Sequence, residues 1–325
     1  MRAKLLTNSK ISVAPMMDWT DRHCRYFHRL MSESILLYSE MITSAAIVLG
    51  GKHILLQHDD FENPLALQLG GNEPVQLAQA CEVANQFNYD EVNLNVGCPS
   101  DRVQSGAFGA CLMAKPDLVA KCIHLMQQRS QVPVTVKTRI GIDEFDNYSF
   151  LVDFVNQVRD VGCKRFIIHA RKAWLNGLSP KQNREIPELN YHRVYQLKED
   201  FPDLEIILNG GVKSVDEVAR HLNYVDGVML GRAAYQTPYL LAEINHAMFH
   251  SESPLPTRMQ IIESYFPYVE SQLSKGVKLS TMTRHILGLF HQCKGAKAWR
   301  RHLSQNAYRE DANLDVLKDA LAFIQ

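Results

Sequence analysis

The chain has 325 residues, of which 46% are hydrophobic, and its 35 basic and 35 acidic residues give a formal net charge of zero. No window approaches the roughly 20 apolar residues of a membrane-spanning helix, and the first ten residues lack the apolar core of a secretory signal. Its 7 scattered cysteines contain no CxxC pair, which argues against a disulfide framework and against a metal site, so we expect a cytoplasmic protein.

Eight short apolar runs follow one another through the first three quarters of the chain. They are Ser12–Pro15, Ile35–Tyr38, Leu65–Leu69, Val92–Val96, Val134–Lys137, Phe166–His169, Ile206–Leu208 and Gly227–Leu230. Most are apolar throughout, as in parallel strands that are covered on both faces. Helical patterns separate several of them, at Pro74–Phe87, Pro116–Arg129, Tyr148–Val161 and Ser214–His221. This alternation predicts a (β/α)8 barrel; a doubly wound open sheet is the alternative, but no GxGxxG follows an early strand.

The strand pattern stops after Arg232. Tyr239–Phe249 has the pattern of a last barrel helix, and Ser251–Pro256 resembles a linker. Four helical patterns follow, at Ile261–Leu273, Thr281–His291, Ala296–Ser304 and Leu314–Ile324. We therefore predict an α/β protein with a TIM barrel over residues 1–250 and a C-terminal α-helical domain over residues 251–325.

Nearly every predicted strand ends in a hydrogen-bonding residue or a glycine. These endings are Ala14–Asp18; Ser39 and Glu40; Gln68; Asn93, Asn95 and Cys98; Lys137 and Arg139; His169 and Arg171; Asn209–Gly211; Gly231 and Arg232. Polar groups in such places disfavour packing unless they surround a polar ligand. The last two endings precede helices, where barrels commonly bind a phosphate.

Cys98 follows the fourth predicted strand, where barrels keep their reactive groups. Pro99 biases its backbone toward extended geometry and so gives the thiol a defined direction. A small buried hydrophobe is the alternative interpretation of this cysteine. Cys111 is a second candidate, but it falls at the predicted start of the next helix.

The stretch from Lys275 to Arg309 contains eight lysines and arginines and no acidic residue. A short charged run is usually a solvated helix face. A basic stretch of this length instead favours a surface that binds phosphates.

Together these segments resemble the FMN-dependent tRNA-dihydrouridine synthases. The motifs are APMMDWTDRHCR, LALQLGG, NLNVGCPSDRVQSGAFGACLM, VTVKTRIG, IIHARKAW, NGG and VMLGR, and the resemblance continues into AWRRHLS. DWTDRHCR and HARKAWLNGLSPKQNREIP resemble the bacterial branch that modifies positions 20 and 20a of the tRNA D-loop.

The resemblance implies FMN as cofactor and NADPH as electron donor. It implies that hydride passes from flavin N5 to uracil C6 and that Cys98 protonates C5, which an unperturbed thiol can do at neutral pH. The implied flavin contacts are Pro15, Met16, Met17 and Gln68 at the ring, Lys137 and His169 beside the ring and ribityl chain, and Asn209, Gly210, Gly211, Gly231 and Arg232 at the phosphate.

The tRNA contacts are predicted from position and charge. Asn95 shares a strand face with Asn93 and can bond the uracil edge. A loop over Ser100–Gly109 can bring the thiol in when RNA binds. Basic residues that can hold the tRNA backbone are Lys181, Arg184, Arg300 and Arg301.

Two other functions remain open at this point. One is an FMN-dependent small-molecule enzyme, such as an ene-reductase or a dihydroorotate-dehydrogenase-like barrel. The other is an RNA-binding protein whose barrel has lost its flavin.

Overall fold

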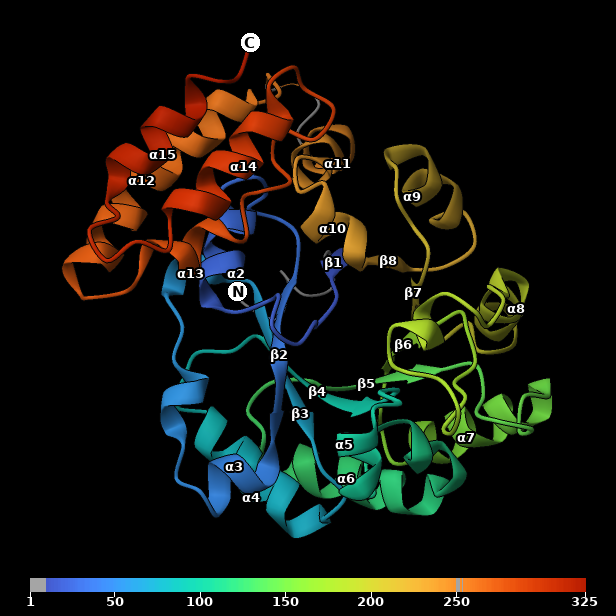
Figure 1. The fold of residues 1–325 in the computed structure, drawn as a ribbon. Coiled ribbons are helices and arrows are strands. Elements are labelled where there is room, and N and C mark those ends of the chain that lie inside the picture. Colours follow the sequence, from blue (N-terminus) through green and yellow to red (C-terminus); the bar gives the residue numbers. More distant parts are fainter. Residues whose placement is uncertain (1–9, 250–251, 253) are drawn as a thin grey trace.

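Eight parallel strands close into a barrel in the computed structural model, which describes residues 10–249, 252 and 254–325 (Figure 1). The strands are β1 Ile11–Val13, β2 Leu37–Thr43, β3 Leu65–Gly70, β4 Glu91–Val96, β5 Val134–Arg139, β6 Arg165–His169, β7 Glu205–Asn209 and β8 Gly227–Leu230. Each strand from β2 to β7 pairs with the next in sequence, and β1 pairs with β8. The barrel closes between β1 and Leu36, where the Val13 N–H donates to the Leu36 carbonyl at 3.0 Å. The predicted TIM barrel is confirmed.

Helices cover the outside of the barrel. The barrel helices are α2 Arg22–Arg29, α3 Ser44–Val48, α4 Pro74–Ala84, α5 Asp101–Ser105, α6 Pro116–Arg129, α7 Tyr148–Asp160, α8 Tyr191–Asp200, α9 Val215–His221, α10 Arg232–Gln236 and α11 Leu240–Phe249. Short 3-10 helices are η1 His53–Leu56, η2 Asp60–Glu62, η3 Gly109–Ala114 and η4 Gln182–Arg184. None of the helices in the described ranges combines the length and apolar character that crossing a bilayer requires.

Side chains alternate between the two faces of the strands, and this alternation makes the barrel interior partly polar. On β4, Val92, Leu94 and Val96 belong to the large outer core, while Asn93 hydrogen-bonds across the interior to Gln68. A separate apolar cluster lies among inward-facing residues: Ala14, Leu36, Tyr38, Ala66, Ile167, Ile207 and Met229. The polar interior therefore continues from the strand ends down into the barrel.

The C-terminal helices pack against the barrel through α2. They are α12 Arg258–Ser274, α13 Leu279–Thr283, α14 Ala296–Asn306 and α15 Leu314–Leu321, drawn in orange and red beside α2 in Figure 1. Tyr26 of α2 stacks on Tyr268 of α12 with ring centroids 3.8 Å apart, and the Tyr268 hydroxyl lies 2.7 Å from His23 Nδ1. Buried residues of these helices belong to the same hydrophobic cluster as the barrel's outer core.

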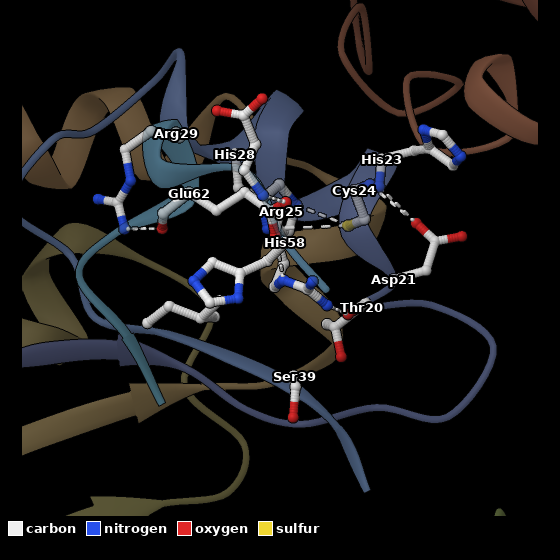
Figure 2. A network of polar contacts seen from close by, with 12 residues as sticks. Thr20, Asp21, His23, Cys24, Arg25, His28, Arg29, Ser39, His58 and Glu62 are labelled. Carbon is white, nitrogen blue, oxygen red and sulfur yellow. Dashed lines mark hydrogen bonds and ion pairs between the residues drawn. The ribbon is translucent and has the colours of Figure 1, made fainter. Parts of the chain in front are cut away.

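A buried network fixes α2 itself (Figure 2). The Arg25 guanidinium donates to the Glu62 carboxylate at 2.6 Å and to the Thr20 carbonyl at 2.7 Å. Arg29 donates to the Glu62 carbonyl at 2.9 Å. Asp21 caps the helix by accepting from two backbone N–H groups, those of His23 and Cys24.

Two predicted elements differ from the structure. The second strand begins at Leu37 and runs to Thr43 through a register shift between Tyr38 and Met41, so Ser39 and Glu40 lie inside it rather than at its end. The predicted helix Thr281–His291 is wrong, because α13 ends at Thr283 and turns follow. Gly288 lies in these turns, and its backbone is so close to the Gln236 carbonyl that a Cβ there would be 2.2 Å from the oxygen.

Two sequence predictions concern segments that the structure does not fully describe. The first nine residues, examined for a signal, lie outside the described residues, as do residues 250, 251 and 253 around the predicted linker and domain boundary.

Candidate active site at the barrel mouth

The thiol of Cys98 lies just past the carboxyl end of β4, at the end of the barrel that we call the mouth. Cys98 is only partly buried, and its Sγ lies 3.5 Å from the Ser100 hydroxyl. The backbone N–H groups of Gly97 and Cys98 donate to Asn95 Oδ1 at 3.1 and 3.0 Å. The predicted position at a strand end is confirmed, and the thiol is not enclosed in the core.

The loop after Cys98 folds back onto its own start. The Cys98 carbonyl accepts from the Ala110 N–H at 2.9 Å, beside Gly109 with its φ of 76°. A Cβ at Gly109 would lie 2.5 Å from that carbonyl oxygen, so the close return requires glycine. The predicted loop Ser100–Gly109 contains the short helix α5.

Two side chains connect this loop to the segment between β6 and α8. Gln104 Nε2 donates to the carbonyls of Pro99 at 2.9 Å and Leu175 at 2.6 Å. The buried Arg139 donates to the Gly97 carbonyl at 2.9 Å and to the Lys172 carbonyl at 2.9 Å. The backbone on either side of Cys98 is therefore held by polar contacts.

Cys111, the second candidate thiol, lies in η3 as predicted for a helix start. Its Sγ donates to the Phe108 carbonyl at 3.2 Å, and burial raises its pKa. The Cys111 thiol is thus hydrogen-bonded to a nearby backbone carbonyl, whereas Cys98 lies among polar groups at the mouth.

Lys137 and His169 both lie at the mouth on neighbouring strands. The Lys137 ammonium donates to Asn209 Oδ1 at 3.0 Å, and Asn209 Nδ2 donates to the Met229 carbonyl at 2.8 Å. Burial and the nearby Arg139 lower the pKa of Lys137 to about 7. Burial and a group of cations that includes Arg139 and Lys137 lower the pKa of His169 well below its usual value.

The predicted phosphate-binding glycines line the same edge. Gly210 and Gly211 have φ values of 116° and 78°, and a Cβ at Gly210 would lie 2.6 Å from the His169 ring. Gly231 is the N-cap of α10, and no atom of the described residues lies within 4 Å of the position that a Cβ would take. Gly210 and Gly211 therefore allow neighbouring side chains to pack closely on this backbone, whereas the space beside Gly231 is open to a ligand.

Arg232 is engaged with the loop after β6. Its guanidinium donates to Glu185 Oε1 at 2.5 Å and to the Arg184 carbonyl at 3.2 Å. Arg184 lies close enough to Cys98 and Arg232 for electrostatic interaction with both. Lys181 precedes η4 in the same loop and is exposed.

The segment after β1 also belongs to the mouth. The Met16 N–H donates to the Thr20 hydroxyl at 2.9 Å, which forms a tight turn. Pro15 and Met16 are partly buried, and the Met17 side chain is 54% exposed. An exposed methionine beside polar groups is available to a planar ligand.

Arg300 and Arg301 lie apart from the strand ends, on α14. Both are exposed, and with Lys297 they share one helix face, opposite the buried Trp299 and Leu303. Not all of the basic stretch is available to a ligand. Arg284 is ion-paired with Asp21 at 2.6 Å.

The contact between Asp21 and the C-terminal helices was not found from sequence. Asp21 also accepts from the His285 ring at 3.0 Å, and that ring lies 3.2 Å from the Tyr235 hydroxyl. Asp21 and His285 are separated by 264 positions in the sequence. The only local signal was the capping preference of an aspartate before a helix.

The residues at the mouth fit a flavin mononucleotide. Lys137, Arg139, Arg171 and Arg184 all lie close enough to His169 to lower its pKa, so the electrostatic environment favours a phosphate. Beside them, Gly231 leaves its backbone open. Gln68 Oε1 accepts from Asn95 at 2.8 Å and its Nε2 donates to Asn93 at 2.9 Å, which leaves one N–H of the Gln68 amide for a ring acceptor.

Comparisons with known proteins agree with this chemistry. The family described as dihydrouridine synthase (Dus) matches residues 12–325. The chain is 58% identical over 315 residues to the tRNA-dihydrouridine(20/20a) synthase of Pasteurella multocida (strain Pm70), which covers 97% of this chain and 96% of that protein. It is 54% identical over 318 residues to the protein of the same name from Escherichia coli (strain K12), covering 98% of this chain and 92% of that one.

One solved structure with a related fold is a 2-naphthoyl-CoA reductase in complex with 2-naphthoyl-CoA. It is 11% identical, with a TM-score of 0.52, and the match covers 73% of this chain and 50% of that one. This likeness concerns the fold alone.

Proposed function

The chain belongs to the dihydrouridine synthase family and reduces uridine in tRNA to dihydrouridine; we propose that it uses FMN and NADPH and acts at D-loop positions 20 and 20a. The observation that supports this most strongly is a partly exposed thiol at a strand end beside a cation-rich edge that contains glycines. We also propose that the enzyme is cytoplasmic, because its substrate is tRNA.

FMN, when bound, supplies the hydride that reaches C6 of the uracil. Its ring would lie against Pro15, Met16 and Met17 and accept a hydrogen bond from Gln68. Lys137 and His169 would lie beside its ring and ribityl chain. Its phosphate would be held by backbone N–H groups and cations at the far edge: Asn209, Gly210, Gly211, Gly231 and Arg232.

Cys98 is the general acid of the proposed reaction. Hydride addition at C6 makes C5 the basic carbon, because the adjacent C4 carbonyl carries the charge as an enolate. The Cys98 thiol donates its proton to C5 on the face opposite the flavin, and Asn95 offers an N–H to the uracil edge. Gln104 and Arg139 hold the backbone that directs this thiol.

The target base must leave its stack to reach the mouth, which costs a few kcal/mol. We assign the compensating phosphate contacts to Lys181 and Arg184 near the mouth and to Arg300 and Arg301 on α14. Residues 1–250 would then form the catalytic domain and residues 251–325 the tRNA-binding domain.

The direct test uses the purified protein and tRNA transcribed in vitro, which lacks dihydrouridine. We expect the protein to carry the visible absorption of a flavin that is released as FMN, and to oxidise NADPH when this tRNA is present. Mass-spectrometric mapping should place the product at positions 20 and 20a. A colourless protein that binds tRNA would contradict the cofactor, and modification at other uridines would contradict the proposed positions.

A further inference from the structure

A chain of buried, hydrogen-bonded side chains runs from the end of the barrel opposite the mouth to Cys98. It begins at Glu91, the first residue of β4, whose side chain is 1% exposed. The Glu91 carboxylate forms an ion pair with Arg165 at 2.8 Å and accepts from the Tyr38 hydroxyl at 2.5 Å. An ion-paired carboxylate can only accept hydrogen bonds, so this end of the chain has a fixed direction.

Thr135 is the next member. Its hydroxyl lies 2.7 Å from Glu91 Oε1 and must donate there. Because its single hydrogen is donated to Glu91, the hydroxyl can only accept a hydrogen bond from Asn93, whose Nδ2 lies 2.8 Å away. Asn93 is fully buried, so it has no water to replace this partner.

The direction continues through two amides. Because Asn93 presents Nδ2 to Thr135, its Oδ1 faces Gln68 and accepts from Nε2 at 2.9 Å. Gln68 then presents Oε1 to Asn95 and accepts from Nδ2 at 2.8 Å. Each amide is thereby restricted to one of its two flipped orientations.

The other end of the chain imposes the same direction. Asn95 Oδ1 faces the backbone N–H groups of Gly97 and Cys98, which can only donate. The Glu91 carboxylate at one end can only accept, and the backbone N–H groups at the other end can only donate. Only one set of amide orientations satisfies both ends. Flipping any amide in between would bring two oxygens together on one side and two N–H groups on the other, which leaves buried groups unsatisfied at about 1–3 kcal/mol each.

We propose that Glu91 and Thr135 are positioning residues for the active site, because they set the orientation of the Asn93, Gln68 and Asn95 amides and through Asn95 hold the backbone of Cys98. The catalytic consequence of this inference rests on the proposed function, since it assumes that Cys98 is the acid. The orientation itself does not depend on that role.

The fixed direction also decides what Asn95 can offer a ligand. Its Oδ1 already accepts two hydrogen bonds and its Nδ2 donates one to Gln68. One N–H remains, so Asn95 can donate to a ligand but has no acceptor left. A base that presents a carbonyl to Asn95 is therefore favoured over one that presents an amino group there.

Thr135→Val tests the inference, with Thr135→Ser as the conservative variant and Thr138→Val as the matched control. Thr138 is an equally buried threonine on the same strand, and its hydroxyl donates to the Val96 carbonyl at 3.2 Å, outside the amide chain. Hydrogen–deuterium exchange of the Gly97 and Cys98 amides reports their bond to Asn95 without requiring activity.

In Thr135→Val we expect these two amides to exchange about tenfold faster than in the wild type. We also expect kcat for tRNA reduction to fall about tenfold with KM for tRNA unchanged, since the acid is displaced while the phosphate contacts remain. Thr135→Ser should restore both values, and Thr138→Val should change neither by more than about twofold.

Unchanged exchange at Gly97 and Cys98 in Thr135→Val, or equal acceleration in Thr138→Val, would overturn the proposal. If Thr135→Val does not fold, the wild type decides, because exchange of these two amides at the rate of an unstructured peptide is incompatible with a held Asn95. If exchange is faster in Thr135→Val but the wild type forms no dihydrouridine, the positioning role is upheld and the proposed function is rejected.

Discussion

Charged residues gather in two regions of this molecule, and they are arranged in opposite ways. Around α2, two groups of opposite charges are paired: Arg25 faces Glu62, and Asp21 faces Arg284 and His285. At the barrel mouth, Lys137, Arg139, Arg171 and Arg184 make no ion pair with any residue that the structure describes. The Asp21 pairs hold the C-terminal helices to the barrel and the Arg25–Glu62 pair holds α2 to η2, whereas the excess of cations at the mouth fits a polyanionic ligand.

The sharpest test of this comparison is to break a paired charge. Arg25→Ala leaves the Glu62 carboxylate buried without its partner, and we expect the free energy of unfolding to fall by about 3–5 kcal/mol. Denaturant unfolding measures the change. The matched control is Arg129→Ala, which removes an exposed pair with Glu82 at 3.5 Å and should change stability by about 0–1 kcal/mol. Equal losses of stability in the two variants would show that the buried ion pair of α2 stabilises the protein no more than an exposed pair does.

Reversing charges on α14 that have no ion-pair partner among the described residues should affect tRNA binding instead of stability. In Arg300→Glu/Arg301→Glu we expect tRNA affinity to fall about tenfold and the salt dependence of binding to weaken by about two phosphate contacts. Binding measured at several salt concentrations checks both. Arg309→Glu is the control, because Arg309 is already bonded to Asp311 at 3.2 Å. Unchanged affinity in the double variant would show that α14 does not contact tRNA, and NADPH oxidation by the flavin should be unaffected.

The smallest expected effect is the uptake of a proton by the protein when FMN binds. Burial lowers the pKa of Lys137 to about 7, so at about pH 8 the free protein carries this amine mostly uncharged. An anionic ligand raises that pKa, so binding of FMN should take up a proton, in a fraction below one. At about pH 5.5 Lys137 is already charged, and its contribution should vanish.

Calorimetric titration of FMN in buffers with different ionisation enthalpies measures this uptake. The Lys137→Met variant should lose it. The same uptake in that variant would mean that another group titrates, and the cation excess at the mouth would then not include Lys137.

The sequence predicted the barrel well because each strand is a local apolar run with a strand-end signal. Lys137, His169, Asn209 and Cys98 could be grouped because the ends of parallel strands meet at one edge. The alternation Glu91, Asn93, Asn95 was visible in the sequence, but the order of its hydrogen bonds depends on the register of β3, β4 and β5. That register is a property of the closed barrel.

The α2 region could not be predicted in this way. Asp21 and His285 meet only because the C-terminal helices pack on the barrel, and no local pattern marks such a distant pair. The predicted helix Thr281–His291 was wrong although its composition favours a helix; in the structure this segment packs against Gln236, a contact far apart in sequence that no local pattern marks.

The central claim is that the Cys98 thiol gives the proton that completes reduction of the base. The most direct measurement mixes flavin-reduced enzyme with tRNA lacking dihydrouridine under anaerobic conditions and follows dihydrouridine by mass spectrometry in a single turnover. Cys98→Ala should retain its flavin and form product at least about 100-fold more slowly than the wild type, while Cys111→Ala should match the wild type. Product formation at the wild-type rate by Cys98→Ala would contradict the account.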